Sequence, residues 1–139
     1  MPTLDDVRRL ATALPEVTDK ISWGAVMWCV AGKGFVWERP LRAKDMAELG
    51  DGAPDGLILG ARVADEGEKQ ALIAESPDVF FTISHLDGYP AVLVRLDAIS
   101  PERLEEVVVD AWLERAPKRL ATAYFAGPGR PGPEGDARA

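Results

Sequence analysis

The sequence predicts a single two-layer α+β domain, in which helices cover one face of a largely antiparallel five-stranded sheet. Its 139 residues suit one domain, and an apolar fraction of 47% is enough for one core. Segments with helical periodicity lie at both ends and in the middle, with short runs rich in β-branched and aromatic residues between them. Because the connections within each group of strands are short, neighbouring strands are expected to pair antiparallel. The predicted order is α-β(3)-α-β(2)-α, over residues 1–126.

The first helix is predicted from its boundary signals. Thr3 and Asp6 form a capping-box pattern, apolar residues then recur at helical spacing, and Pro15 ends the helix. The elements that follow in the first half are a connector (16–25), a strand (26–30), a hairpin-like turn (31–34), a strand centred on 35–37, one or two helical turns (43–49) and a loop (50–56).

The second half contains the remaining strands and helices. Asp65 with Glu68 predicts the start of a helix that ends near residue 75, and Ser100-Pro101 predicts the start of another long helix. The other predicted elements are strands at 57–63, 79–83 and 91–96, a hairpin loop at 84–90 and a short helix at 118–125. Residues 127–139 are rich in Gly and Pro and are predicted to be a disordered tail, because they cannot bury an apolar face.

Charge and cysteine content argue against several functional classes. There are 16 basic and 23 acidic residues, for a net charge of −7, whereas non-specific nucleic-acid binders usually carry a basic surface. The single cysteine, Cys29, excludes an internal disulfide and a cysteine-based zinc site, and its apolar neighbours predict a buried thiol. The N-terminus has no signal-peptide pattern and no apolar run is long enough to span a membrane, so a cytoplasmic location is expected. No metal or cofactor is expected.

The only histidine, His85, is not part of a recognisable catalytic motif. Ser84 and Asp87 are close to it in sequence, but a serine beside its own histidine rarely reaches it in a productive geometry. The chain has no Gly-x-Ser-x-Gly motif and no glycine-rich phosphate loop. We therefore predict that the protein is not an enzyme, and that His85 either hydrogen-bonds within its own loop or lines a pocket.

Four ring-bearing side chains define a candidate cleft. Trp23 lies in the predicted connector, Trp37 ends a strand, and His85 and Tyr89 share the predicted hairpin loop. The other two tryptophans fall on apolar stripes and are predicted to lie in the core. An indole N–H at a surface cleft can donate to a ligand. One hypothesis is therefore that Trp23, Trp37, His85 and Tyr89 line a cleft for a small molecule or a protein partner.

Basic residues gather in two places, which supports a second hypothesis. Each group has a local net charge of +3, one within residues 33–44 and one within residues 115–119. If DNA binds, the predicted phosphate contacts are Lys33, Arg39, Arg42, Lys44, Lys118 and Arg119. The two groups must then share one face, because a single cluster spans only a few phosphates. The alternative is a solvated charged edge that discourages strand pairing.

Several segments resemble the MmcQ/YjbR family, and they occur in the order found in that family. The matching segments are Ser22-Trp23-Gly24, residues 34–41 (GFVWERPL), residues 80–85 (FFTISH) with 88–94 (GYPAVLV), and Ala111-Trp112 with residues 116–120 (APKRL). Together they extend over nearly all of residues 3–125.

The resemblance implies both a fold and a function. Members of this family form a two-layer α/β domain similar to the chaperones of type III secretion, in the order α-β(3)-α-β(2)-α. They are commonly described as DNA-binding, through a proposed double-wing motif, and no catalytic activity or cofactor is associated with them. The resemblance therefore favours a non-catalytic protein that makes weak contacts with DNA phosphates through a basic edge, while the acidic net charge favours a ligand or partner cleft.

Overall fold

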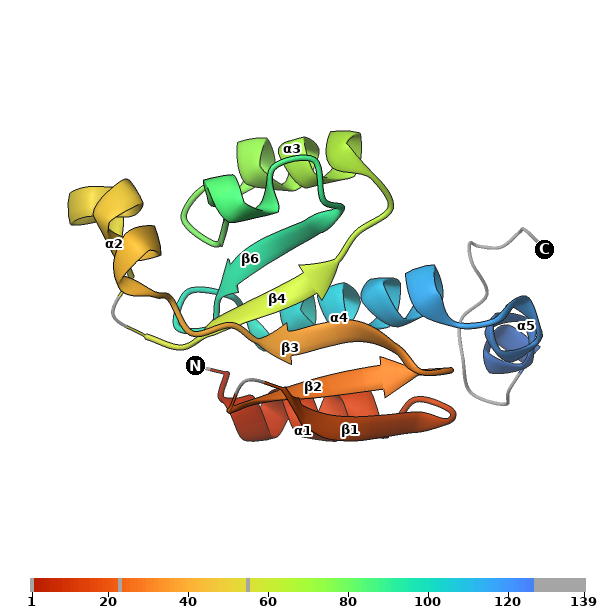
Figure 1. Cartoon of the computed structure of the whole chain (residues 1–139). Helices are drawn as coiled ribbons and strands as arrows, with labels where there is room; N and C mark the ends of the chain where they lie inside the picture. The colour runs from red at the N-terminus through yellow and green to blue at the C-terminus, as the bar shows by residue number, and fades with distance from the viewer. Residues whose placement is uncertain (1, 23, 55, 127–139) are drawn as a thin grey trace.

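A computed structural model describes residues 2–22, 24–54 and 56–126. Its centre is an antiparallel sheet of six strands in the order β1-β2-β3-β4-β6-β5 (Figure 1). The strands are β1 (Val17–Ser22), β2 (Ala25–Val30), β3 (Lys33–Glu38), β4 (Ile58–Arg62), β5 (Phe80–Phe81) and β6 (Ala91–Arg95). The helices are α1 (Leu4–Thr12), α2 (Ala43–Leu49), α3 (Glu66–Glu75), α4 (Pro101–Arg115) and α5 (Lys118–Ala126), with 3-10 turns η1 (Gly50–Gly52) and η2 (Ser84–Leu86).

The predicted α+β class and antiparallel sheet are confirmed, but the sheet has six strands rather than five. The additional strand is β1, which occupies most of the segment that we expected to be a connector. It pairs with β2 along its whole length, from Val17 opposite Val30 to Ser22 opposite Ala25. The predicted strand at 79–83 is reduced to the two residues of β5, and the loop after it contains η2.

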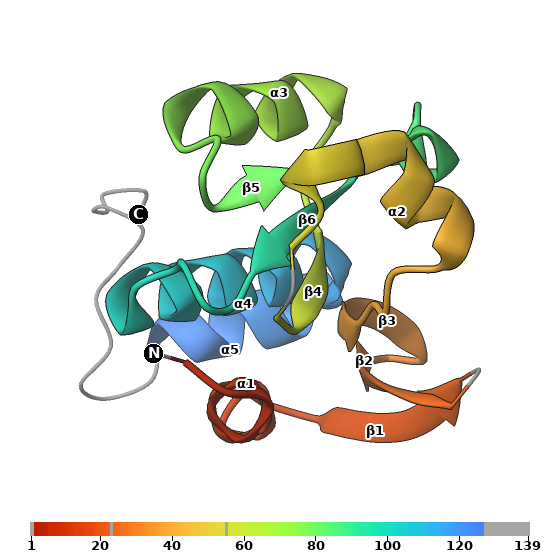
Figure 2. The same ribbon diagram turned by 90° about the vertical axis from the view of Figure 1, so that its left-hand side faces the viewer.

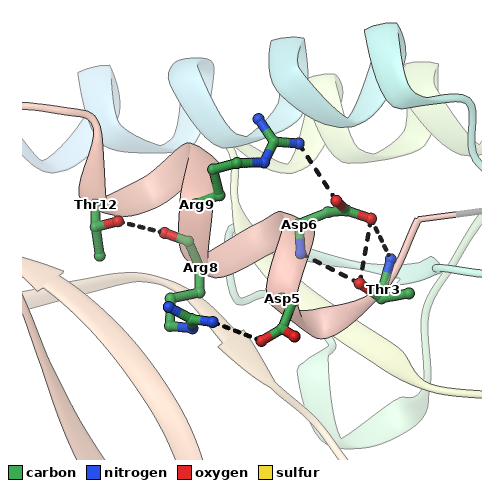
Figure 3. A network of polar contacts seen from close by, with 6 residues as sticks. All are labelled: Thr3, Asp5, Asp6, Arg8, Arg9 and Thr12. Atoms are coloured by element: carbon green, nitrogen blue, oxygen red, sulfur yellow. Dashed lines mark hydrogen bonds and ion pairs between the residues drawn. The ribbon is translucent and has the colours of Figure 1, made fainter.

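Helix α1 begins as the sequence predicts, with a capping box (Figure 3). The amide of Asp6 donates to the Thr3 hydroxyl at 3.3 Å, and the amide of Thr3 donates to the Asp6 carboxylate at 2.8 Å. This second bond is the main cause that lowers the pKa of Asp6, and Arg9 at 3.3 Å contributes. The cap satisfies backbone donors that have no partner within the first helical turn.

The main core lies between the sheet and helices α1 and α4. Helix α4 presents Leu104, Val107, Val108, Ala111 and Trp112 to strands β3 and β4, as its apolar stripe predicts. The core includes Trp28 and Val36, which are cross-strand neighbours on β2 and β3. The Trp112 indole donates to the carbonyl of Pro15 at 3.2 Å, which fixes the end of α4 to the segment that precedes β1.

A smaller apolar cluster lies on the opposite side of the sheet, here called the outer face. Leu93 belongs to this cluster, whereas its neighbours Val92 and Val94 belong to the main core, because successive side chains on a strand point to opposite faces. Helix α2 and turn η2 cover the cluster through Leu49 and Leu86. Figure 2 shows α2 and α4 on opposite sides of β4 and β6, so the helices do not all cover one face of the sheet, which differs from the arrangement that the sequence predicts.

The predicted tail, residues 127–139, lies outside the described residues. Within the part of the chain that the structure describes, none of the helices combines the length and apolar character needed to cross a bilayer. Cys29 is buried in β2, as its apolar neighbours predict.

Candidate functional site

A row of apolar residues crosses the outer face of the sheet. Directly paired residues on neighbouring strands point to the same face. Met27 pairs with Trp37, Trp37 with Gly60, Gly60 with Leu93, and Leu93 with Phe81. Leu93 and Phe81 are covered by α2 and η2, whereas Met27 and Trp37 remain partly exposed. One half of this row is therefore core, and the other half is available to a ligand.

Trp37 lies flat because its neighbour on β4 is a glycine. A Cβ atom on Gly60 would overlap the indole ring at its Nε1, Cε2 and Cζ2 atoms. The absence of a side chain at Gly60 therefore lets the indole lie across the backbone of β4. Met27 lies over Gly34 in a similar way, where an added Cβ would come within 2.6 Å of its sulfur. Two glycines thus allow two large side chains to form a level apolar floor.

This floor belongs to a groove of about 380 Å³, here called the Trp37 groove. It lies between β2 and the segment that leaves β3, and it is lined by Ala25, Val26, Met27, Trp37, Glu38, Arg39, Pro40, Leu41 and Arg42. Its volume falls within the range of small-molecule sites. Lys20 pairs with Met27 and so adds an exposed positive charge to the same face of the sheet.

A second hollow of about 250 Å³, here called the basic hollow, adjoins the Trp37 groove. It is lined by Arg39, Arg42, Lys44, Asp45, Ser84 and His85. The two cavities share Arg39 and Arg42 in their linings, so they lie next to each other. With His85 neutral, three cations against one carboxylate give the hollow a net charge of +2.

One of the three cations, Arg39, forms an ion pair within the protein. The Arg39 guanidinium lies 3.2 Å from the Asp45 carboxylate, and both side chains are largely buried. The same carboxylate accepts a hydrogen bond from the amide of Arg42 at 3.0 Å, at the start of α2. Arg39 and Asp45 therefore fix α2 against the end of β3. The side chains of Arg42 and Lys44 are exposed and form no ion pair with a described residue.

Turn η2 is held from two sides, and this positions His85. On one side, the Glu48 carboxylate of α2 accepts hydrogen bonds from the amide and the hydroxyl of Ser84, each at 2.8 Å. On the other side, the ammonium of Lys69 on α3, which is fully buried, donates to the carbonyl of Leu86 at 2.8 Å. His85 lies between these anchors and is exposed at the edge of the basic hollow.

The geometry around His85 does not form a nucleophilic dyad among the described residues. The Ser84 hydroxyl is bonded to Glu48, and no hydrogen bond joins His85 to another described side chain. The nearby carboxylate of Asp45 is held by Arg39. His85 can therefore act as a hydrogen-bond donor to a ligand in the hollow.

The structure brings together only part of the predicted aromatic cleft. Trp37 and His85 line the two adjoining cavities. Tyr89 lies elsewhere, where its hydroxyl accepts a 3.4 Å hydrogen bond from Arg62, whose guanidinium carbon is 5.3 Å from the ring centre. Trp23 lies outside the described residues.

The structure divides the predicted basic residues between the two ends of the sheet, and the first predicted cluster is itself split. Arg39, Arg42 and Lys44 follow the last residue of β3, whereas Lys33 is its first residue, about 20 Å away at the rise of an extended strand. Arg119 and Lys118 lie at the Lys33 end, because Arg119 pairs at 3.3 Å with Glu16, which directly precedes β1. Figure 1 shows α2 and α5 at opposite ends of the molecule.

Local sequence patterns do not reveal several residues of the site. They place Met27 in an apolar strand without distinguishing it, and they give no role to Asp45 or Glu48. Strict alternation along β2 could have placed Met27 on the face opposite Trp28. The roles of Asp45 and Glu48 depend on tertiary contacts with Arg39 and Ser84, which no local pattern reveals.

The fold and these adjoining cavities define a class of protein: an α+β domain with a partly open sheet face and a basic rim. Comparison with known proteins gives its family. The profile described as YjbR matches residues 12–114, and the chain belongs to the YjbR family. The resemblance seen in the sequence is thereby confirmed.

Two mycobacterial relatives and one solved structure are similar to the chain. The uncharacterised proteins Mb2600 of Mycobacterium bovis and Rv2570 of Mycobacterium tuberculosis are each 48% identical to it, over 93% of this chain and all of the relative. The crystal structure of Deinococcus radiodurans protein DR2400, a DUF419 domain, has a TM-score of 0.63 and 22% identity, over 94% of this chain and 91% of the other. That similarity supports the fold alone.

Proposed function

We propose that the protein is a non-catalytic binding module whose ligand lies in the Trp37 groove. The observation that carries this proposal is the partly exposed Trp37, laid flat over Gly60 beside Met27, in a cavity of about 380 Å³. When an apolar ligand covers a water-exposed apolar floor of this kind, the removal of apolar surface from water favours binding. Two glycines that make room for it also distinguish the groove from an incidental gap between side chains.

The contacts around His85 also support a non-catalytic function. Ser84 and Asp45, the residues beside His85 that could activate a nucleophile or orient a base, are engaged by Glu48 and Arg39. General-base catalysis needs a base within hydrogen-bond reach of its target and an orienting partner. These contacts instead give a rigid rim around the cavity.

Binding of a bicyclic aromatic probe tests this proposal. Calorimetric titration with 2-naphthol and with 2-naphthoate should show saturable binding of at least one of them, and Trp37→Ala should weaken it. Tyr89→Ala removes a comparable exposed aromatic ring outside the groove and should leave the affinity unchanged. If neither probe binds, or if Trp37→Ala has no more effect than Tyr89→Ala, the groove is not the functional site.

DNA binding through a basic edge, implied by the family resemblance, is the second candidate function. The exposed and unpaired Arg42 and Lys44 favour it. Separation of the two clusters limits the contacts at either end of the sheet to two or three. The expected signature is weak binding to duplex DNA, with a slope of log K against log salt of about −2 to −3. Fluorescence anisotropy at low salt tests this, and no binding at tens of micromolar protein removes it.

We also propose that the protein is cytoplasmic, as the sequence predicts, and cell fractionation tests this location.

A further inference from the structure

We propose that the ligand is an organic anion: an apolar, preferably aromatic body that covers Met27 and Trp37, joined to a single carboxylate or phosphate group that enters the basic hollow. This inference rests on the proposed function, because it names the ligand of the same site. The additional observation is the basic hollow next to the Trp37 groove, on which the proposed function does not depend.

The first support is the connection between two cavities of different chemistry. The groove has an apolar floor, and the hollow next to it is lined by Arg39, Arg42, Lys44 and His85. Since Arg39 and Arg42 line both cavities, they lie where the two meet, and a ligand on the apolar floor can contact them with its anionic end. A ligand with an apolar end and an anionic end matches the apolar floor and the basic hollow beside it.

The second support is the state of the cations. Asp45 already neutralises Arg39, so a ligand is not needed to balance that charge. Arg42 and Lys44 have exposed side chains and form no ion pair with a described residue, although Asp45 and Glu48 lie on the same short helix. Glu48 is directed to Ser84 and accepts two hydrogen bonds there. Two charged donors, together with His85, are thus left facing the hollow.

The third support is the rigidity of the donors' surroundings. The Arg39–Asp45 ion pair fixes the start of α2, and Glu48 and the buried Lys69 fix η2, which carries His85. Donors on a fixed frame lose less conformational entropy when a ligand binds. The backbone frame of the hollow is therefore already fixed before an anion binds.

The position of the charges limits the class of ligand further. Arg42 and Lys44 line the basic hollow, whereas Met27 and Trp37 form the apolar floor of the groove. A second negative charge on the apolar body would be desolvated over this floor and be disfavoured. A monoanion with its charge at one end fits better than a polyanion such as a nucleic-acid strand, whose charges repeat along its length.

Two probes of matched shape separate charge from apolar contact. 2-Naphthoate and 2-naphthol carry the same ring system, and only the first is an anion at pH 7. We expect wild-type protein to bind 2-naphthoate about tenfold more tightly at low salt, and we expect added NaCl to remove most of that preference. The double variant Arg42→Gln/Lys44→Gln should bind both probes with the affinity that wild-type protein has for 2-naphthol.

The matched control is Lys33→Gln/Lys118→Gln, which removes the same charge from the opposite end of the sheet. It should retain the tenfold preference. If both double variants lost affinity for 2-naphthoate equally, the effect would come from the net charge of the protein and not from the basic hollow, and the inference would be overturned. Equal affinity of wild-type protein for both probes would also overturn it, yet the proposed function would stand if Trp37→Ala still abolished binding. Displacement of 2-naphthoate by a ten-nucleotide oligo(dT), more effectively than by free 2-naphthol, would identify a nucleic-acid strand as the occupant and contradict a monoanion.

Discussion

At the scale of single residues, the site depends on the packing of a tryptophan side chain over a glycine. Gly60 is opposite Trp37 in the register of β3 and β4, and the indole occupies the space where a side chain would stand. A glycine inside a strand normally weakens it. Here the large ring that covers the glycine restores the buried surface, so the two residues should behave as one unit.

Gly60→Ala tests this coupling. The new methyl group would overlap the indole, so we expect a loss of about 1–3 kcal/mol in the free energy of unfolding, measured by chemical denaturation. In a Trp37→Ala background the same substitution should cost far less, because the overlap is gone. Gly52→Ala is the control, since no atom lies within 4 Å of a Cβ at that position. Equal costs in both backgrounds would mean that the two residues do not interact.

Asp110 offers a test of the charge pattern on α4. Burial raises its pKa, and the carboxylates of Glu106 and Glu68 add to the effect. A carboxyl with a raised pKa in the folded state binds its proton more tightly there, so stability is lost as pH rises from the ordinary value of 3.8 through the folded-state pKa. Asp110→Asn should therefore increase the free energy of unfolding at pH 7, by well under about 1 kcal/mol because the residue is exposed and water screens its charge.

The same variant should show no gain near pH 3, where the wild-type carboxyl is protonated. Urea denaturation at both pH values measures the difference. Glu105→Gln removes the same charge from an exposed position of the same helix and serves as the control. A gain for Glu105→Gln equal to that for Asp110→Asn would assign the effect to net charge instead of the site.

At the scale of elements, the sequence predicted the helices better than the sheet. The caps of α1, α3 and α4 were predicted from Thr3, Asp65 and Ser100, and each side chain accepts the expected backbone hydrogen bond. Caps are local, since donor and acceptor lie within three residues. Strand β1 was missed because Thr18, Asp19 and Lys20 are polar and exposed, as suits an edge strand, and only pairing with β2 makes the segment a strand.

The candidate site was predicted in part for a related reason. Trp37 and His85 stood out as ring-bearing residues outside the apolar stripes, and they line adjoining cavities. Arg39 was expected to contact phosphate, but its side chain is largely buried against Asp45. That contact joins β3 to α2 across a chain reversal. It depends on tertiary geometry, which spacing along the chain does not determine.

The turn η2 should be stable only while α2 supports it. Glu48→Ala removes the acceptor for the amide and hydroxyl of Ser84. We expect faster hydrogen exchange for residues 84–86 and weaker binding of 2-naphthoate, because His85 loses its fixed position. Asp51→Ala, at an exposed position in η1, is the control. Unchanged exchange in Glu48→Ala would show that Lys69 alone holds the turn.

At the scale of the whole molecule, the two faces of the sheet have different roles. The face toward α1 and α4 carries the main core, and the outer face carries the small cluster under α2 and the open groove. The sequence predicts that residues 127–139 form a disordered tail, because this Gly- and Pro-rich segment cannot bury an apolar face. A chain that ends at residue 126 should therefore retain a single cooperative thermal transition, measured by calorimetry against the full chain. A broad or multistep transition would show that the last residues contribute to the fold.

The central claim is that a ligand covers Trp37 on the outer face of the sheet. The most direct test is a two-dimensional ¹H–¹⁵N NMR titration that follows the indole N–H groups, assigned with Trp→Phe variants, as 2-naphthoate is added. Trp28 and Trp112 are buried in the main core on the opposite face and serve as internal references. The account predicts a large, saturable shift for Trp37 and almost none for Trp28 or Trp112. No shift at Trp37, or shifts of similar size at all three, would contradict it.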